Sequence, residues 1–165
     1  WGVTYGNSTW VTNGDNGSIF TSSDTNSWDN RTSGSGTTVE LNEVIYGNST
    51  FVAFGYSGTI LTSSDGTTWT SRTSGTSYVL PGGTYGKNIF VTVGDNGTIL
   101  TSSDGTSWTS RSSGTTEKLR GITYGNSMFV AVGKSGTILT SSDGTTWTSS
   151  TSGTSKHLRR VTYKE

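Results

Sequence analysis

The apolar residues of this chain occur in short runs separated by Gly, Asn, Asp and Ser. Within Lys118 to Thr154, four such runs predict β-strands: Leu119–Tyr124, Met128–Val132, Thr137–Ser141 and Thr146–Ser150. The run Met128–Val132 is continuously apolar, as in a strand covered on both faces, whereas Trp147 is followed only by Thr and Ser. The pattern therefore predicts two inner strands followed by strands nearer the solvent.

The breaks between these runs carry the residues of tight hairpins. Gly125-Asn126-Ser127 follows the first run, Lys134-Ser135-Gly136 the second and Asp143-Gly144 the third. Asn and Gly accept the positive φ angles of two-residue hairpin turns, and Asp15-Asn16-Gly17 and Asp95-Asn96-Gly97 carry this signal most clearly. Because short turns join neighbouring antiparallel strands, each unit is predicted to be a four-stranded meander.

The same unit occurs four times. Trp28, Trp69, Trp108 and Trp147 are spaced by 41, 39 and 39 residues, and Tyr5, Tyr46, Tyr85, Tyr124 and Tyr163 follow the same rhythm. The series Trp10, Phe51, Phe90 and Phe129 agrees. The two extra residues of the first unit fall within Ser35 to Glu43, which marks that connection as a loop.

A sheet of about 40 residues cannot cover both of its own apolar faces, so neighbouring units must stack, either around an axis or in a line. Four strands in a period near 40 favour the radial arrangement. The predicted fold is all-β, a β-propeller of four-stranded antiparallel meander blades, with about four repeats of 39–41 residues plus one extra strand. The whole chain, 1–165, forms a single propeller or propeller segment. Its units are approximately 1–40, 41–79, 80–118 and 119–157, with a partial fifth unit at 158–165.

The expected extra strand is Leu158 to Tyr163. Four units of four strands and this one make seventeen, whereas a closed four-bladed ring needs sixteen. Three arrangements remain open: an extra edge strand, a segment of a larger propeller, or several chains that complete one another. The first residues, Trp1 to Asn7, resemble neither a signal peptide nor an initiator segment, and we expect a mature or cut start.

Composition narrows the function classes. Hydrophobic residues are 28% of the chain and charged residues 13%, with eleven basic against eleven acidic. We expect no nucleic-acid partner, because no polybasic surface is indicated, and no membrane insertion, because no apolar run approaches about 18 residues. No cysteine is present. A weakly charged surface rich in Ser, Thr, Gly and Asn predicts an extracellular, cell-surface or virion location.

A phrase near each repeated Trp resembles a known motif. SSDGTTW occurs at Ser63 and Ser141, SSDGTSW at Ser102, and the altered form SSDTNSW at Ser22. These phrases resemble the Asp box, or bacterial neuraminidase repeat, of sialidase-like propellers. The wider unit is similar to repeats of secreted bacterial propellers and of the photosystem II assembly factor propellers. The resemblance covers nearly the whole chain and implies architecture rather than one activity.

We interpret the Asp boxes as structural. Each Asp begins a hairpin, where its carboxylate can accept hydrogen bonds from backbone N–H groups one or two residues on, the preceding Ser can do the same, and the Trp covers the turn. One carboxylate per turn is a poor calcium site, so no metal is expected. The residues given this role are Ser22, Asp24, Trp28, Ser63, Asp65, Trp69, Ser102, Asp104, Trp108, Ser141, Asp143 and Trp147.

The opposite end of each unit differs from repeat to repeat. In a meander, the turn after the second strand and the connection into the next unit emerge together, and these are the segments that vary. Variable loops on a repeated scaffold are where ligands are expected, although solvated loops without function are the simpler reading of any one residue. The candidate ligand-binding residues are Tyr56, Tyr78, Asp95, Asn96, Lys118, Arg120, His157 and Arg159.

No catalytic group is predicted. A sialidase resemblance would imply an arginine triad, but Arg31, Arg72 and Arg111 occupy one repeated site on the expected outer strand. Glu40 and Glu43 are the only near carboxylate pair in a variable loop, and His157 is the only histidine. No phosphate loop, zinc spacing or nucleophile elbow occurs. We therefore expect no enzyme and no cofactor.

Three functional classes follow. The first is a non-catalytic recognition module that binds a glycan or a protein through its variable loops, where Tyr56 and Tyr78 would suit sugar stacking. The second is a structural or assembly module of a virion, fibre or surface layer, in contact with other copies of itself or a larger assembly. The third, a sialidase-like glycoside hydrolase, is disfavoured because the catalytic inserts are absent.

Overall fold

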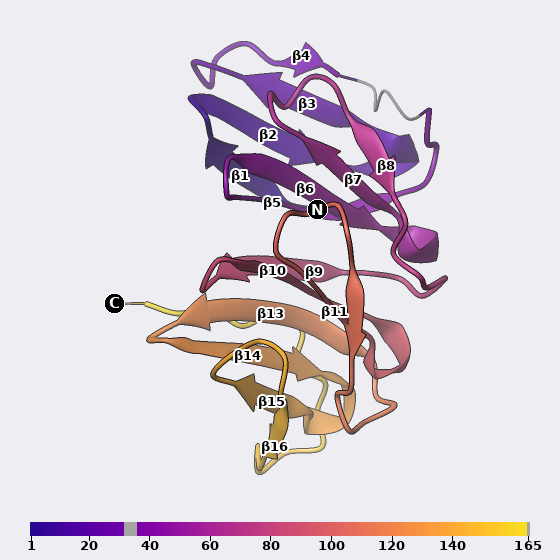
Figure 1. Ribbon diagram of the computed structural model, residues 1–165, viewed down its shortest axis with the longest axis vertical. Coiled ribbons are helices and arrows are strands. Elements are labelled where there is room, and N and C mark those ends of the chain that lie inside the picture. The colour runs from indigo at the N-terminus through magenta and orange to yellow at the C-terminus, as the bar shows by residue number, and fades with distance from the viewer. Residues whose placement is uncertain (32–35, 165) are drawn as a thin grey trace.

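The computed structural model describes residues 1–31 and 36–164, which form four consecutive four-stranded antiparallel sheets (Figure 1). We call them blades 1 to 4. Blade 1 contains β1 (Val3–Gly6), β2 (Thr9–Asn13), β3 (Ile19–Ser22) and β4 (Asp29–Asn30), and blade 2 contains β5 (Leu41–Gly47), β6 (Thr50–Gly55), β7 (Ile60–Ser63) and β8 (Thr70–Arg72). Blade 3 contains β9 (Gly82–Gly86), β10 (Ile89–Val93), β11 (Ile99–Ser102) and β12 (Thr109–Arg111), and blade 4 contains β13 (Leu119–Gly125), β14 (Met128–Gly133), β15 (Ile138–Ser141) and β16 (Thr148–Ser150).

This arrangement confirms the predicted meander. Strands pair in sequence order within every sheet, and the bounds predicted for blade 4 are correct to within two residues. The fourth strand starts at Thr148 rather than Thr146 because Trp147 turns back and donates its indole N–H to the Gly144 carbonyl at 3.1 Å. Ser35, the first residue of the segment predicted to hold the insertion, lies outside the described residues.

The turns have the expected chemistry. One 3₁₀ turn joins the second and third strands of each blade: η1 (Asp15–Gly17), η2 (Tyr56–Gly58), η3 (Asp95–Gly97) and η4 (Lys134–Gly136). In η1, both Asn16 and Gly17 have positive φ, at 54° and 70°, and the Ser18 N–H donates to the Asp15 carbonyl at 3.0 Å. This is the backbone of a type I′ hairpin turn, which explains the Asn-Gly signal.

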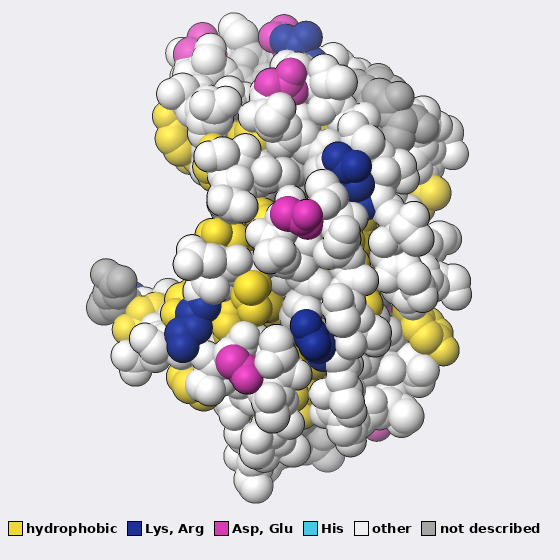
Figure 2. All heavy atoms as spheres, in the orientation of Figure 1, with side chains coloured by type: hydrophobic (Ala, Val, Ile, Leu, Met, Phe, Trp, Pro, Cys, Tyr) yellow, Lys and Arg dark blue, Asp and Glu magenta, His cyan; other side chains and the backbone are white. Residues whose placement is uncertain are grey.

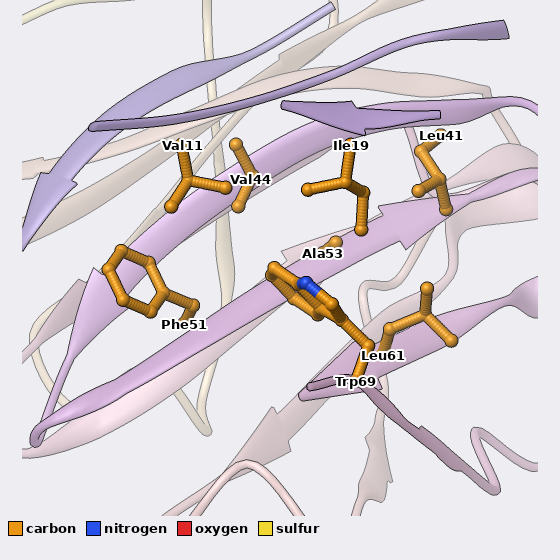
Figure 3. Close-up of a cluster of buried hydrophobic side chains, with 8 residues drawn as sticks. All are labelled: Val11, Ile19, Leu41, Val44, Phe51, Ala53, Leu61 and Trp69. Carbon is orange, nitrogen blue, oxygen red and sulfur yellow. The ribbon is translucent and has the colours of Figure 1, made fainter. Parts of the chain in front are cut away.

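The core lies between the blades. We call the side of a blade that faces the preceding one its front face, and the other side its back face. Val11 and Ile19, on the back face of blade 1, pack with a set of buried front-face residues of blade 2 (Figure 3): Leu41, Val44, Phe51, Ala53, Leu61 and Trp69. Equivalent clusters join blade 2 to blade 3 and blade 3 to blade 4.

The first strands of the blades line up side by side, β1 on β5, β5 on β9 and β9 on β13. A Tyr–Gly contact fixes their separation. The Tyr46 ring of blade 2 lies against Gly6 of blade 1 so closely that a Cβ at Gly6 would fall inside it, and Tyr85 meets Gly47 in the same way. A side chain at these glycines would therefore push neighbouring blades apart.

The four blades form an open arc, in which they follow one another along the long axis of the molecule (Figure 1). The front face of blade 1 therefore lacks a covering blade. Val3, Tyr5 and Trp28 are 59%, 54% and 41% exposed, whereas Val44 and Trp69, the counterparts of Val3 and Trp28 in blade 2, are 1% and 3% exposed. The curvature of the arc leaves an uncovered apolar face at its start.

The predicted extra strand at Leu158 to Tyr163 is not formed, since no residue of this segment belongs to a strand. The segment nevertheless lies where a first strand would. Leu158 donates its N–H to the Gly133 carbonyl at 2.9 Å, as Leu119 does to Gly94 at 3.0 Å, and Tyr163 lies against Gly125 as Tyr124 lies against Gly86. A β-strand needs a hydrogen-bonded neighbour, and no second strand of a fifth blade is present to supply one among the described residues.

Within residues 1–31 and 36–164, no helix has the length and apolar character needed to cross a bilayer.

Thr25 is the one Asp-box position in which a β-branched residue replaces glycine. Its φ is +67°, close to the +74° to +77° of Gly66, Gly105 and Gly144, and a β-branched side chain is disfavoured there. Thr25→Gly is expected to raise the free energy of unfolding by about 1 kcal/mol, measured as a higher urea midpoint. Gly105→Thr is the reciprocal control and should lower the midpoint. An unchanged midpoint in Thr25→Gly would mean that the turn carries no strain.

Candidate functional site

The variable turns and the connections into the next blade are joined by backbone hydrogen bonds. Tyr56 N–H donates to the Glu40 carbonyl at 3.0 Å, Asp95 N–H to the Val79 carbonyl at 3.1 Å, and Lys134 N–H to the Lys118 carbonyl at 2.8 Å. The two sets of variable segments therefore form one end of the molecule, as the meander predicts. The same bonds hold each connection against the turn of the blade that it enters, which positions the start of that blade's first strand.

A hollow of about 340 Å³ opens at this end, where the first strands of the blades begin. Each first strand contributes the same repeat positions, and residues 157–161 contribute a fifth set. We call this cavity the axial hollow. Its lining residues are Trp1, Asn42, Glu43, Pro81, Gly82, Arg120, Gly121, Ile122, His157, Arg159, Arg160 and Val161.

Bulges and glycines shape the axial hollow. The strand register shifts between Leu41 and Glu43 and between Leu119 and Gly121, so Asn42 and Arg120 are the bulged residues of β5 and β13. A bulge leaves one residue outside the pairing and redirects its side chain. Glycine at 82 and 121 lets the neighbouring backbones approach, since an added Cβ at Gly121 would lie 3.1 Å from the Arg159 carbonyl oxygen.

The charge of the axial hollow is mainly positive. Arg120, Arg159 and Arg160 are exposed and form no salt bridge within the described part of the chain. Glu43 is the opposing charge: burial raises the pKa of its carboxyl, while the Val44 N–H and the charge of Arg160 act in the other direction. Over the face seen in Figure 2, by contrast, charged side chains are few and of both signs.

Two polar groups of the axial hollow have an incomplete set of partners. His157 accepts the Ser135 N–H through Nδ1 at 3.1 Å, so in its neutral form the proton lies on Nε2. Asn42 Nδ2 is the one buried side-chain nitrogen or oxygen without a hydrogen-bond partner among the described residues. An unsatisfied buried amide costs about 1–3 kcal/mol. Such groups in a native fold call for a functional or structural explanation.

The predicted ligand residues separate into two groups. Arg120, His157 and Arg159 meet in the axial hollow. Tyr78 and Asn96 lie in a shallow groove on the side of blade 3, where Asn96 Nδ2 donates to the Tyr78 hydroxyl at 3.0 Å. Three further residues lie outside the lining of both cavities: Lys118 and Asp95, which form an ion pair, and the exposed Tyr56.

Four further residues complete the axial hollow and are not among the predicted ligand residues: Trp1, Asn42, Glu43 and Arg160. A signal for them existed in the repeat. Positions 2, 43, 82, 121 and 160 are equivalent, and they hold Gly, Glu, Gly, Gly and Arg. The two positions that depart from glycine carry opposite charges, and Arg160 acts on the Glu43 carboxyl.

The Asp boxes lie at the other end and act as turn fasteners. Asp65 Oδ1 accepts the N–H groups of Thr67 and Thr68 at 2.8 and 2.9 Å, and Ser63 Oγ accepts those of Asp65 and Gly66 at 3.3 and 2.8 Å. The acceptors thus reach two and three residues on, rather than one or two as expected. Trp69 donates its indole N–H to the Gly66 carbonyl at 3.0 Å, which closes the turn.

The remaining candidates for chemistry are accounted for by local contacts. Arg72 and Arg111, on the outer strands β8 and β12, donate through Nε to Thr62 and Thr101 at 2.8 and 2.9 Å, and Arg31 does the same to Thr21 at 3.3 Å. These arginines therefore do not converge on the axial hollow. Within residues 1–31 and 36–164, no three His, Asp or Glu side chains gather in a way that could hold a metal ion.

Solved structures place the fold among β-propellers. The chain aligns with YCF48 bound to D1 peptide at 15% identity and a TM-score of 0.65, over 89% of this chain and 50% of that one. For YCF48 from Cyanidioschyzon merolae, the identity is 17%, the TM-score 0.70 and the coverage 99% and 59%. For the GH74 enzyme of Niastella koreensis, the values are 21%, 0.63, and 89% and 23%.

The chain thus spans between half and three fifths of the YCF48 chains and about a quarter of the GH74 chain. No protein-family model matches the chain, and no curated protein matches it. No match to a family model therefore supports the Asp-box resemblance. These similarities establish the propeller fold alone.

The Asp boxes predict an acid-sensitive fold. Hydrogen bonds to the carboxylates hold the pKa of Asp65, Asp104 and Asp143 well below the usual value for Asp. The main donors are the Thr68 N–H, the Thr106 hydroxyl and the Thr146 N–H, in the same order. An Asp whose pKa is lower in the folded than in the unfolded chain stabilises the fold at any pH above its unfolded pKa of about 4. This contribution to the free energy of unfolding is lost as the pH falls from there through the pKa of the folded state. Urea midpoints should therefore fall steeply below about pH 4.

The triple variant D65N/D104N/D143N tests this assignment. It should have a lower urea midpoint at neutral pH and a flatter dependence on pH, because the amide accepts hydrogen bonds without a charge. Asp15→Asn, which removes a carboxylate from a variable turn, is the matched control. A triple variant as acid-sensitive as the parent chain would contradict the role given to the boxes.

Proposed function

We propose that the chain is a non-catalytic recognition propeller whose axial hollow binds an acidic peptide segment through carboxylate side chains. The observation that carries the proposal is the gathering of Arg120, Arg159 and Arg160 around one cavity of about 340 Å³. Guanidinium groups bind carboxylates bidentately and remain charged at every physiological pH. An anionic ligand is therefore the class that this cavity fits best.

The surroundings of the arginines support an anion rather than a structural ion pair. Only Glu43 opposes them among the lining residues, and its own carboxyl is partly desolvated. His157 can add another donor, because Nδ1 already accepts the Ser135 N–H and Nε2 has no hydrogen-bond partner among the described residues. One carboxylate against three guanidinium groups leaves a net positive site.

The fold supports a peptide as the carrier of the carboxylates. A propeller of the same fold, YCF48, has been solved bound to D1 peptide, and an open end of such a fold can admit an extended segment. A glycan is the alternative ligand, favoured by the 44% exposed ring of Tyr78 beside Asn96. We propose an extracellular, cell-surface or virion location, because the chain is weakly charged and rich in Ser, Thr, Gly and Asn.

Fluorescence anisotropy with a labelled peptide rich in Glu and Asp tests the proposal. Arg120→Glu and Arg159→Glu should each weaken binding at least about tenfold, because each reverses a charge at the cavity wall. Glu43→Gln should strengthen binding, since it removes the competing carboxylate. Raising the ionic strength should weaken binding by the parent chain.

Lys87→Glu is the charge-matched control, because Lys87 is exposed in the first turn of blade 3, at the opposite end of the molecule. It should leave peptide affinity unchanged. The same peptide with Gln and Asn in place of its acids should not bind. Binding of a neutral glycan that is lost in Tyr78→Ala and Tyr56→Ala but kept in the arginine variants would replace the peptide proposal with the glycan alternative.

A further inference from the structure

The uncovered front face of blade 1 has the composition of an internal blade interface. Trp10, Phe20 and Trp28 occupy the positions of Phe51, Leu61 and Trp69, which are buried between blades 1 and 2. In blade 1 the first two are half-buried and Trp28 is 41% exposed. A contiguous exposed apolar face of this kind marks an interaction site.

The back face of blade 4 is the complementary surface. Val130 and Ile138 are half-buried there, whereas their counterparts in the other three blades, Val11, Ile19, Val52, Ile60, Val91 and Ile99, are 0% exposed. Inside the chain, front and back faces of this composition pack on one another three times. The sequence thus contains both halves of a fourth interface of the same kind.

We propose that two copies of this chain dock head to tail, with the front face of blade 1 in each copy covering the back face of blade 4 in the other. The curvature of the arc supports two copies. The chain follows the YCF48 structures over 50% and 59% of their length, so a chain of this fold has room for about as many blades again. Two interfaces related by a two-fold axis close such a ring with eight blades, four from each copy.

The segment 159–163 occupies the place that the incoming β1 would take. Val161-Thr162-Tyr163 repeats Val3-Thr4-Tyr5, and Tyr163 covers Gly125 as Tyr46, Tyr85 and Tyr124 cover Gly6, Gly47 and Gly86. Only one first strand fits against β13, so this segment must leave when a second copy docks. It is held without strand pairing, whereas β1 arrives with the rest of its sheet.

One residue prevents the two docked faces from packing as closely as the faces inside the chain. Gly66 of blade 2 lies close to the back face of blade 1, where an added Cβ would lie 3.1 Å from Val11 Cγ2. Blade 1 has Thr25 at this position, so the docked blade must shift by a few tenths of an ångström. We therefore expect a reversible dimer rather than a permanent one.

Sedimentation equilibrium of the full chain over a range of concentrations tests the proposal. The expected species are a monomer of 17.4 kDa and a dimer of twice that mass. Tyr163→Ala frees the place at Gly125 and should lower the dissociation constant several-fold. Trp28→Asp and Ile138→Asp should each raise it at least about tenfold, because each places a charge in the apolar contact.

The matched control is Tyr56→Asp, which changes a side chain of similar exposure, 43%, in a turn away from both faces. It should leave the dimer intact. A mixture of Trp28→Asp and Ile138→Asp chains should associate although neither does alone, since one intact front face then meets one intact back face. Far-UV circular dichroism and urea midpoints confirm that each variant is folded.

Four results would overturn the proposal. A monomer at every concentration in both the parent chain and Tyr163→Ala rules out docking. Dimerisation of Ile138→Asp alone indicates front-to-front contact, and masses above the dimer indicate open chains rather than a ring. A dimer that Tyr163→Ala does not strengthen contradicts the role of residues 159–163. None of these readouts depends on the acidic peptide, so this inference and the proposed function can fail separately.

Discussion

The structure depends on one constraint: a four-stranded sheet of this size has two apolar faces and cannot cover either of them by itself. In blades 2 and 3, both faces of the second and third strands are buried, as with Phe51 and Val52 on opposite sides of β6. The hydrophobic effect therefore acts between blades rather than within them. Burial of one large apolar side chain contributes about 1.5–3 kcal/mol, so each blade depends on its neighbours. Stacking thus lets a chain with few apolar residues bury enough of them to fold. It also leaves one face of each end blade, the front of blade 1 and the back of blade 4, without a cover in the single chain.

The remaining repeated residues keep the blades in a shape that can stack. The Tyr–Gly contacts hold the first strands at a constant separation. The Asp boxes close the turn between the third and fourth strands with hydrogen bonds that one Ser and one Asp accept and one Trp donates. None of these residues needs to change from blade to blade, because the same geometry recurs. The opposite end has no such requirement, and the residues that vary are gathered there around the axial hollow.

Much of the fold could be predicted from the sequence because local chemistry and periodicity agree in it. The Asn-Gly and Asp-Gly turns, the apolar second strand and the spacing of Trp28 to Trp147 each predict the same meander. The prediction at Leu158 to Tyr163 was wrong because strand formation depends on a partner that local sequence does not reveal. The grouping of side chains around the axial hollow was not predicted. Arg120, His157 and Arg159 were selected as variable residues, but Glu43 and Arg160 meet them only because the five inner segments converge in space.

The axial hollow and the docking surface share residues 159–163, and this couples the two proposals. In the monomer, Arg159 and Arg160 line the hollow, and the charge of Arg160 acts on Glu43. In the closed ring, this segment has left, and Trp1 and Gly2 of the second copy occupy the equivalent positions. An acidic ligand that binds Arg159 therefore favours the monomer, and docking of a second copy weakens the ligand by the same factor, because coupling free energies are reciprocal. Docking would thus replace Arg159 and Arg160 in the cavity wall by Trp1 and Gly2 of the second copy. The position of residues 159–163 would therefore determine both the charge of the cavity and whether the ring is closed.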